Sequence, residues 1–178
     1  MLAWLVILLA LVVVGTFAWG GLRGAPWVPT WNQDLPRIVA LAEVRPGEVV
    51  ADLGCGTGGV LAAFARSGCA VRGWEIAIVP WLISWLRLRR FPDTQIRFSD
   101  FWNADLSACT CVYVFLFPTK FARLREKLEH DLQPGSRVIV CTWPVPGWTP
   151  IAVDRPSPKL LPIYRYEIGR TVLASERK

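Results

Sequence analysis

The sequence predicts an α/β protein in which a doubly wound, mostly parallel sheet follows one apolar helix. Three observations predict this class: an uncharged apolar block at the start, strands that alternate with helices after it, and a glycine-rich turn behind the first strand. The chain has 178 residues, of which 53% are apolar and five are cysteines. This composition excludes disordered, collagen-like and disulfide-scaffold proteins.

The apolar block covers residues 1–19, of which 17 are apolar and none is charged. As a helix it would span about 28 Å, close to the ~30 Å hydrocarbon core of a bilayer. No basic residue precedes the run, and it continues well past the length of a signal-peptide core. Trp4 and Trp19 lie near its two ends, where indole rings favour the headgroup zone. We therefore expect a retained single-pass transmembrane anchor.

Charge and cysteine usage predict the compartment and the partners. Basic residues follow the anchor and none precedes it, which favours a cytoplasmic domain. The net charge is +6, but no run of five like charges occurs, so we expect no nucleic-acid partner. The densest basic cluster, Arg87, Arg89 and Arg90, could contact anionic lipid of the bilayer. Cys109 and Cys111 have the wrong spacing for a zinc knuckle, so we expect no metal.

The rest of the chain is expected to form a linker at residues 20–30 and one domain at residues 31–178. The first helix is expected at 35–42, where apolar residues recur at helical spacing. The stretch 109–117 is almost purely apolar and aromatic, as in a strand buried on both faces. The full pattern predicts strands at 48–53, 70–75, 94–98, 109–117 and 137–142, and further helices at 58–67, 77–90 and 120–131.

After residue 142 the alternation stops. Residues 143–150 form a loop rich in proline and tryptophan. Residues 160–168 and 171–175 are expected to form a short antiparallel pair at the end of the sheet. In such a sheet, ligands bind at the carboxyl ends of the parallel strands.

The glycine turn, DLGCGTGG at residues 52–59, lies between the first strand and the following helix. Its backbone N–H groups and the helix dipole would face a ligand, and its spacing also fits a dinucleotide fingerprint. Asp52 decides between the two ligand classes. A carboxylate about 4 Å from a pyrophosphate charge would cost on the order of 4 kcal/mol at an effective dielectric of 20. A cofactor with a sulfonium and an ammonium would instead be attracted.

Residues 49–58, VVADLGCGTG, resemble the hhDhGxGxG motif of the seven-strand (class I) methyltransferases that use S-adenosylmethionine (SAM). The resemblance implies a Rossmann-like fold and SAM as the cofactor. It also implies that Glu75 binds the ribose hydroxyls, that Asp100 receives the adenine amino group and that Phe101 or Trp102 lies near the ring. The cofactor-binding residues implied are Asp52, Leu53, Gly54, Cys55, Gly56, Gly58, Glu75, Ile76, Asp100, Phe101, Pro29 and Thr30.

A closer resemblance extends over about residues 25–150. The segments PWVPT (26–30), DFWNADLS (100–107) and CTWPVPGWTP (141–150) are similar to a group of membrane-anchored protein-lysine methyltransferases. These are related to the mitochondrial lysine methyltransferases for the ATP synthase c-ring protein and the adenine nucleotide translocator. The resemblance implies a lysine of an integral membrane protein as substrate. The chain departs from the group at Thr57, where members often carry a second acid.

The substrate side is predicted from aromatic residues at the ends of the later strands. Phe117-Pro118 differs from the N-P-P-Y type of sequence associated with amide and nucleobase methylation. Trp27 and Trp31 also fall on loops predicted to face the cofactor side, and tryptophan faces attract cationic amines. The substrate-pocket candidates are Trp102, Phe117, Pro118, Trp143 and Trp148.

No catalytic side chain is predicted. The single histidine, His130, lies on a predicted surface helix, so a target lysine would lose its proton to water, helped by burial. Two other functions stay open. One is a SAM-dependent methyltransferase of a lipid or quinone, and the other is a non-catalytic SAM-binding module on the membrane.

Overall fold

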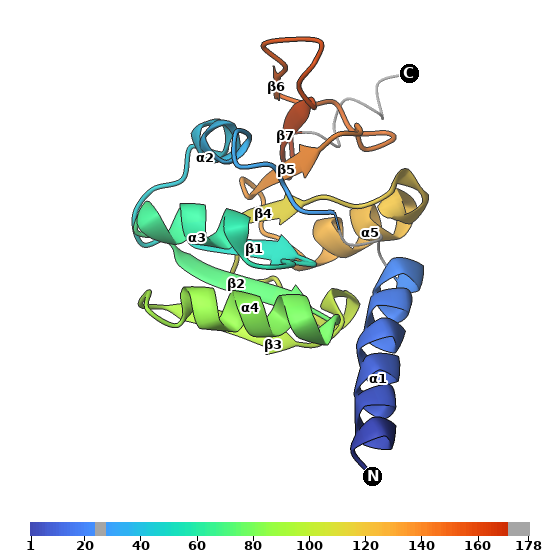
Figure 1. Cartoon of the computed structure of the whole chain (residues 1–178). Helices are drawn as coiled ribbons and strands as arrows, with labels where there is room; N and C mark the ends of the chain where they lie inside the picture. The colour runs from blue at the N-terminus through green and yellow to red at the C-terminus, as the bar shows by residue number, and fades with distance from the viewer. Residues whose placement is uncertain (24–27, 171–178) are drawn as a thin grey trace.

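The computed structural model describes residues 1–23 and 28–170, with helices on both faces of a single sheet (Figure 1). The helices are α1 (Leu2–Arg23), α2 (Leu35–Ala42), α3 (Gly59–Arg66), α4 (Ile78–Leu88) and α5 (Phe121–Asp131), with short 3-10 turns η1 (Phe101–Asn103) and η2 (Pro118–Lys120). The strands are β1 (Val49–Leu53), β2 (Ala70–Glu75), β3 (Thr94–Phe98), β4 (Cys111–Val114), β5 (Arg137–Cys141), β6 (Ala152–Asp154) and β7 (Ile163–Glu167).

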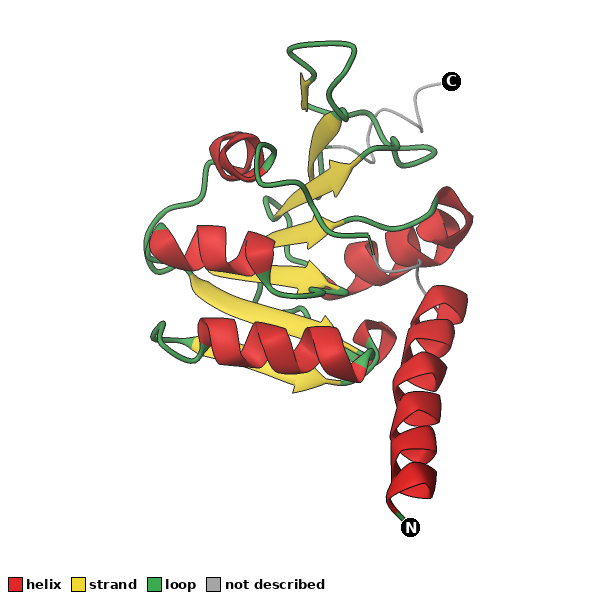
Figure 2. Cartoon of the chain, in the orientation of Figure 1, coloured by secondary structure: helices red, strands yellow, loops and turns green. Residues whose placement is uncertain are grey.

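The seven strands are ordered β3-β2-β1-β4-β5-β7-β6 (Figure 2). Strands β1 to β5 pair in parallel, whereas β7 is antiparallel to both of its neighbours. The strand order reverses between β1 and β4, so the helices that follow these two strands, α3 and α5, pack on opposite faces of the sheet. This is the switch point at which open α/β sheets bind ligands.

A short antiparallel pair lies at the end of the sheet, as expected, and one of its two strands is the expected one. Strand β7 lies within the expected 160–168 segment, and its pairing partner beyond β5 is β6, which the sequence pattern did not indicate. The expected strand at 171–175 lies outside the described residues. Strand β4 is also shorter than expected, because the chain leaves the sheet after Val114 and turns into η2 at Pro118.

The sheet is covered on both faces by apolar side chains. Leu61 and Phe64 of α3 pack on one face, and Leu124 and Leu128 of α5 pack on the other. Strand β1 lies between these layers, with four of its five residues buried. The carboxyl end of β1, which carries Asp52, is therefore held rigidly in the middle of the sheet.

Among the residues of α1 whose burial is described, those packed against the domain lie in its second half. Val13, Thr16, Phe17 and Gly20 are half-buried, at the i, i+3, i+4 and i+7 spacing of one helix face. The Thr16 hydroxyl accepts a hydrogen bond from the Ile78 N–H, 3.3 Å away, at the start of α4. The segment Leu2–Gly21 has a mean hydropathy of 2.5 and is long enough, by length and composition, to cross a bilayer.

Candidate active site

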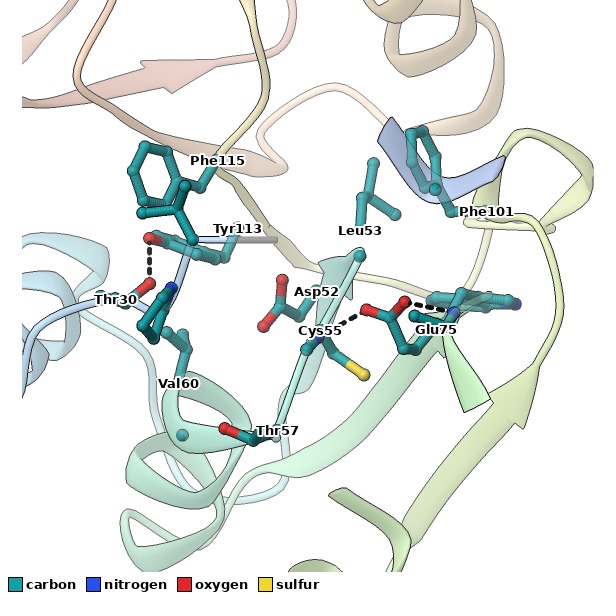
Figure 3. A pocket seen from close by; sticks show the side chains of 18 of the residues that line it. Thr30, Asp52, Leu53, Cys55, Thr57, Val60, Glu75, Phe101, Tyr113 and Phe115 are labelled. Carbon is teal, nitrogen blue, oxygen red and sulfur yellow. Dashed lines mark hydrogen bonds between the residues drawn. The ribbon is translucent and has the colours of Figure 1, made fainter. Parts of the chain in front are cut away.

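A cavity of about 220 Å³ opens at the carboxyl ends of β1, β2 and β4 (Figure 3). The glycine turn forms its floor, and the segment before α2 and the second half of α1 complete its wall. Its lining includes Asp52, Leu53, Gly54, Cys55, Gly56, Glu75, Ile76, Phe101, Pro29 and Thr30 from the sequence prediction. Ten of the twelve predicted cofactor residues are thus brought together, while Gly58 and Asp100 are not part of this lining.

The glycine turn is fastened to the neighbouring strand by its backbone. The N–H groups of Gly54 and Cys55 both donate to the Trp74 carbonyl of β2, at 3.0 Å each. Gly54, Gly56 and Gly58 have φ angles of 85°, 53° and 73°, a left-handed region that favours glycine. The turn can therefore bring its backbone close to a ligand without side chains in the way.

Gly58 has a packing role. A Cβ built on it would lie 2.5 Å from the Ser84 hydroxyl and 2.9 Å from a methyl of Leu88, both on α4. Only glycine allows α3 to approach α4 this closely. Its neighbour Gly59 lines the cavity instead, and Gly58 positions the helix whose amino end faces the ligand space.

Glu75 ties two turns together beneath the cavity. One carboxylate oxygen accepts from the Gly56 N–H at 2.9 Å, and the other accepts from the Ala77 N–H at 2.7 Å. Burial raises the pKa of Glu75, and these backbone donors oppose that rise. Each carboxylate oxygen keeps a second lone pair. Glu75 can therefore accept hydrogen bonds from a diol as well.

Asp52 is the most strongly perturbed acid of the site. Its side chain is 4% exposed and lies between Glu75 and the pair formed by Thr30 and Tyr113 (Figure 3). Burial, and after it the charge of Glu75, raises the pKa of Asp52 to about 8. A cation placed beside it would lower this pKa, because an opposite charge stabilises the ionised form. The site is therefore built to favour a positively charged ligand.

Tyr113 is a cavity residue that the sequence analysis missed. It lies on β4 directly opposite Asp52 of β1, and its hydroxyl is 3.0 Å from the Thr30 hydroxyl. This hydrogen bond holds the segment before α2 over the cavity. The available signal was alternation along β4, because side chains alternate between the two faces of a sheet. A residue of β4 paired with Asp52 therefore points to the same face as Asp52.

Asp100 lies in a neighbouring groove between α1 and β3. It lines that groove together with Thr16, Trp19 and Phe98, while its flanking residues Ser99 and Phe101 line the main cavity. One Asp100 carboxylate oxygen accepts from the Trp102 N–H at 3.0 Å and caps η1. Its expected contact with adenine stays a prediction.

The substrate candidates divide into two groups. Phe117 and Trp143 meet edge to face after β4 and β5, with ring centroids 5.7 Å apart, and Pro118 follows at the surface. Trp102 and Trp148 are buried instead and do not line the cavity. Trp102 lies under the Arg123 guanidinium at 4.2 Å, and the Trp148 indole donates to Glu129 at 2.8 Å. Substrate contact by any of them stays a prediction.

The remaining polar residues define what chemistry the cavity can perform. Among the described lining residues, the charged side chains are Asp52, Glu75 and Arg87, and none is histidine or lysine. His130 is exposed on α5. Within residues 1–23 and 28–170 no cluster of side chains fits a metal ion. Trp31 is exposed, and Trp27 lies outside the described residues.

Comparison with known proteins agrees with this geometry. The family model of the ANTKMT methyltransferase domain matches residues 52–152, which include the glycine turn, both acids of the cavity and strands β2 to β5. The chain is 32% identical over 130 residues to the rat lysine N-methyltransferase of the ATP synthase C subunit, covering 70% of this chain and 59% of that protein. It is 32% identical over 134 residues to the mouse adenine nucleotide translocase lysine N-methyltransferase, covering 72% and 57%.

A solved structure shares the fold. The RNA methyltransferase from Salinibacter ruber, in complex with S-adenosyl-L-homocysteine, superposes with a TM-score of 0.73 at 27% identity. The superposition covers 79% of this chain and 94% of that one. The chain thus spans nearly all of this solved structure but less than two thirds of the two mammalian relatives.

Proposed function

Because the chain belongs to the family of ANTKMT methyltransferase domains, we propose that it is a SAM-dependent protein-lysine N-methyltransferase acting on a membrane-associated protein. The observation that carries the proposal is the pair of buried acids, Asp52 and Glu75, at a glycine turn in the family's matched region. Together they favour a cofactor that brings a cation and a diol rather than a pyrophosphate.

The residues present fit SAM. The backbone of the glycine turn and Asp52 would hold the ammonium end, Glu75 the ribose hydroxyls, and Phe101 the adenine face. Trp74, at the end of β2, adds a second aromatic wall. Bound SAM supplies a methyl group on a positively charged sulfur.

The protein side of the reaction is positioning and exclusion of water. A lysine amine must be neutral to accept a methyl group, which from a pKa of about 10.4 costs roughly 4.6 kcal/mol at pH 7. Phe115 and Leu116 line the cavity at the end of β4, and the Phe117–Trp143 pair follows them. Apolar surroundings lower the pKa of an ammonium, so these residues favour the neutral amine. The proton then leaves to water.

The lysine specificity is supported by the relatives' substrates. The rat and mouse relatives are named for lysines of the ATP synthase C subunit and the adenine nucleotide translocase. Both substrates are membrane-associated proteins. In this proposal, residues 1–19 form a single-pass anchor, residues 20–30 a linker, and residues 31–178 a methyltransferase domain on the cytoplasmic side. The anchor raises the domain's effective concentration toward lysines at the membrane surface.

The test is product analysis with methyl-labelled SAM. Purified full-length chain is incubated with membranes stripped of peripheral proteins, and the protein, lipid and RNA fractions are counted separately. We expect label in a protein band whose hydrolysate contains methyl-lysine. The matched control is Glu75→Gln, which keeps the side-chain shape but should lose most of the label.

Three outcomes would overturn the assignment in different ways. Label in the organic extract would indicate a lipid or quinone substrate. Label in added RNA would indicate the activity named for the Salinibacter ruber relative. Binding of SAM without any labelled product would indicate a non-catalytic SAM-binding module.

A further inference from the structure

Helix α4 carries an exposed apolar stripe beside the anchor helix. Val79, Leu82, Ile83 and Leu86 recur at i, i+3, i+4 and i+7, with Trp85 next to them, and each is 40–46% exposed. The opposite face of the helix, with Pro80, Ser84 and Leu88, is buried against the domain. An exposed apolar stripe of this extent marks an interaction surface.

The stripe continues onto the edge strand β3. Trp81 of α4 and Phe98 of β3 are in contact, with ring centroids 5.4 Å apart, and Phe98 is 49% exposed. Phe98 also lines the groove shared with Thr16 and Trp19 of α1. One apolar surface therefore runs from the anchor across β3 to α4. We name it the α4 surface: Val79, Leu82, Ile83, Trp85, Leu86 and Phe98.

The charged residues on α4 and just beyond it are basic, whereas the nearest acids outside the cavity are Asp93 before β3 and Asp100 in the groove beside Phe98. Arg87, Arg89 and Arg90 are exposed at the carboxyl end of α4, and Arg97 is exposed on β3. No acidic residue occurs from Ile76 to Pro92. An apolar stripe edged by arginine and tryptophan is the pattern of a helix that lies in the interface of an anionic membrane.

The depth of α4 agrees with that placement. Thr16 contacts the first residue of α4, and the apolar span ends at Gly21, five residues later. At 1.5 Å per residue, α4 begins about 7.5 Å inside the end of the span. Interfacial helices are buried about 5–10 Å into the boundary between headgroups and acyl chains. Helix α4 also runs across α1 rather than along it, as a helix lying in the membrane plane would (Figure 1).

We propose that the α4 surface docks on an anionic bilayer. Docking holds the domain in the headgroup layer and fixes its orientation relative to the membrane. The inference rests on the proposed anchoring by α1. Docking would fix the cavity, which α1 helps to line through Phe17 and Gly20, at a set height above the hydrocarbon. Lysines within reach would then be those near the membrane surface.

The experiment measures the depth of single nitroxide labels on the full-length chain. Leu82→Cys and Leu86→Cys report on the α4 surface. Val153→Cys is the matched control, because Val153 is an exposed apolar residue on β6, at the opposite edge of the sheet. The five native cysteines are buried, which favours selective labelling. The chain is reconstituted in phosphatidylcholine vesicles with and without phosphatidylserine, and accessibility to oxygen and to a nickel chelate is compared.

We expect labels at 82 and 86 to be more accessible to oxygen than to nickel, and the label at 153 to show the reverse. Arg89→Glu/Arg90→Glu should shift the labels toward water in the anionic vesicles. Labels at 82 and 86 that match the label at 153 would overturn the proposal. Spin–spin broadening at 82 that increases with protein density would also overturn it, since a second copy would then cover the surface.

Two further readouts keep this test separate from the proposed function. Resistance of the chain to alkaline extraction reports on the anchor alone, and methyl-lysine formation reports on the activity alone. Thermal unfolding and SAM binding of the labelled variants show that each remains folded. Water-exposed labels on a chain that still resists extraction and forms methyl-lysine would refute docking while leaving the activity intact.

Discussion

The two halves of the sheet's carboxyl edge differ in chemistry. At β1 and β2 the edge carries two buried acids, of which Glu75 is fixed by backbone hydrogen bonds from Gly56 and Ala77. At β4 and β5 it carries aromatic rings, with Phe117 against Trp143. The first half positions a ligand with fixed charges and dipoles. The second half offers apolar surface to an incoming amine, which must be neutral to accept a methyl group from a cationic donor.

Glu75→Ala should have the largest effect, because it removes the acceptor of two buried N–H groups. An unsatisfied buried donor costs about 1–3 kcal/mol, so the free energy of unfolding should fall by about 2–6 kcal/mol. SAM binding should be lost as well. Chemical denaturation and calorimetry measure the two effects. Glu126→Ala on the exposed face of α5 is the control, and a Glu75→Ala protein as stable as that control would contradict the role of Glu75.

Asp52→Asn removes the negative charge of the other buried acid, at the end of β1, with little change in side-chain shape. Removing a charge-assisted contact of about 1.5–3 kcal/mol should weaken SAM binding roughly 10- to 100-fold. The stability of the fold should not fall, since a buried carboxyl with a raised pKa is replaced by a neutral amide. Equal SAM affinity in the two proteins would show that Asp52 does not contact the cofactor's cation.

The pH dependence of binding sharpens the role of Asp52. Its pKa of about 8 means that the carboxyl is mostly protonated below pH 8, while a cationic ligand binds the ionised form. The dissociation constant for SAM should therefore rise by up to about tenfold for each pH unit below the pKa and level off above it. Binding measured on both sides of the pKa checks this, and the Asp52→Asn protein should show a flat profile.

Trp143→Ala and Phe117→Ala test the aromatic half of the sheet's carboxyl edge. Burying one or two lysine methylenes against these rings contributes about 0.8 kcal/mol each, so KM for the protein substrate should rise roughly 4- to 15-fold. SAM affinity should stay unchanged, because neither residue lines the cofactor cavity. Val153→Ala, at an exposed apolar residue on the edge strand β6, is the control. A loss of SAM affinity in the Trp143 or Phe117 variant would show that the two halves are not separate.

Features set by local sequence could be predicted, whereas features set by long-range pairing could not. Strands β2 and β3 have their expected bounds, and the glycine turn lies where a ligand-binding turn belongs, because local patterning determines both. Strand β6 was missed, since its three residues form a strand only by pairing with β7. Local pattern says little about partners that the fold brings together. Phe17 of α1 and Tyr113 of β4 line one cavity although 96 positions separate them.

The aromatic half was predicted less well for a related reason. Trp102 and Trp148 belong to loops at the correct edge of the sheet, but their rings turn into the core. Composition indicates that many indoles lie near the site and cannot indicate which way each side chain points. The contacts that bury these two rings, Arg123 for Trp102 and Glu129 for Trp148, come from α5.

The most direct test of the central claim is calorimetry of the full-length chain with SAM and, separately, with NAD, at a pH near the Asp52 pKa of about 8. The claim is that buried acids at the glycine turn select a cationic methyl donor over a pyrophosphate. We predict saturable binding of SAM and none of NAD. Binding of NAD at comparable affinity, or no heat with SAM, would contradict it.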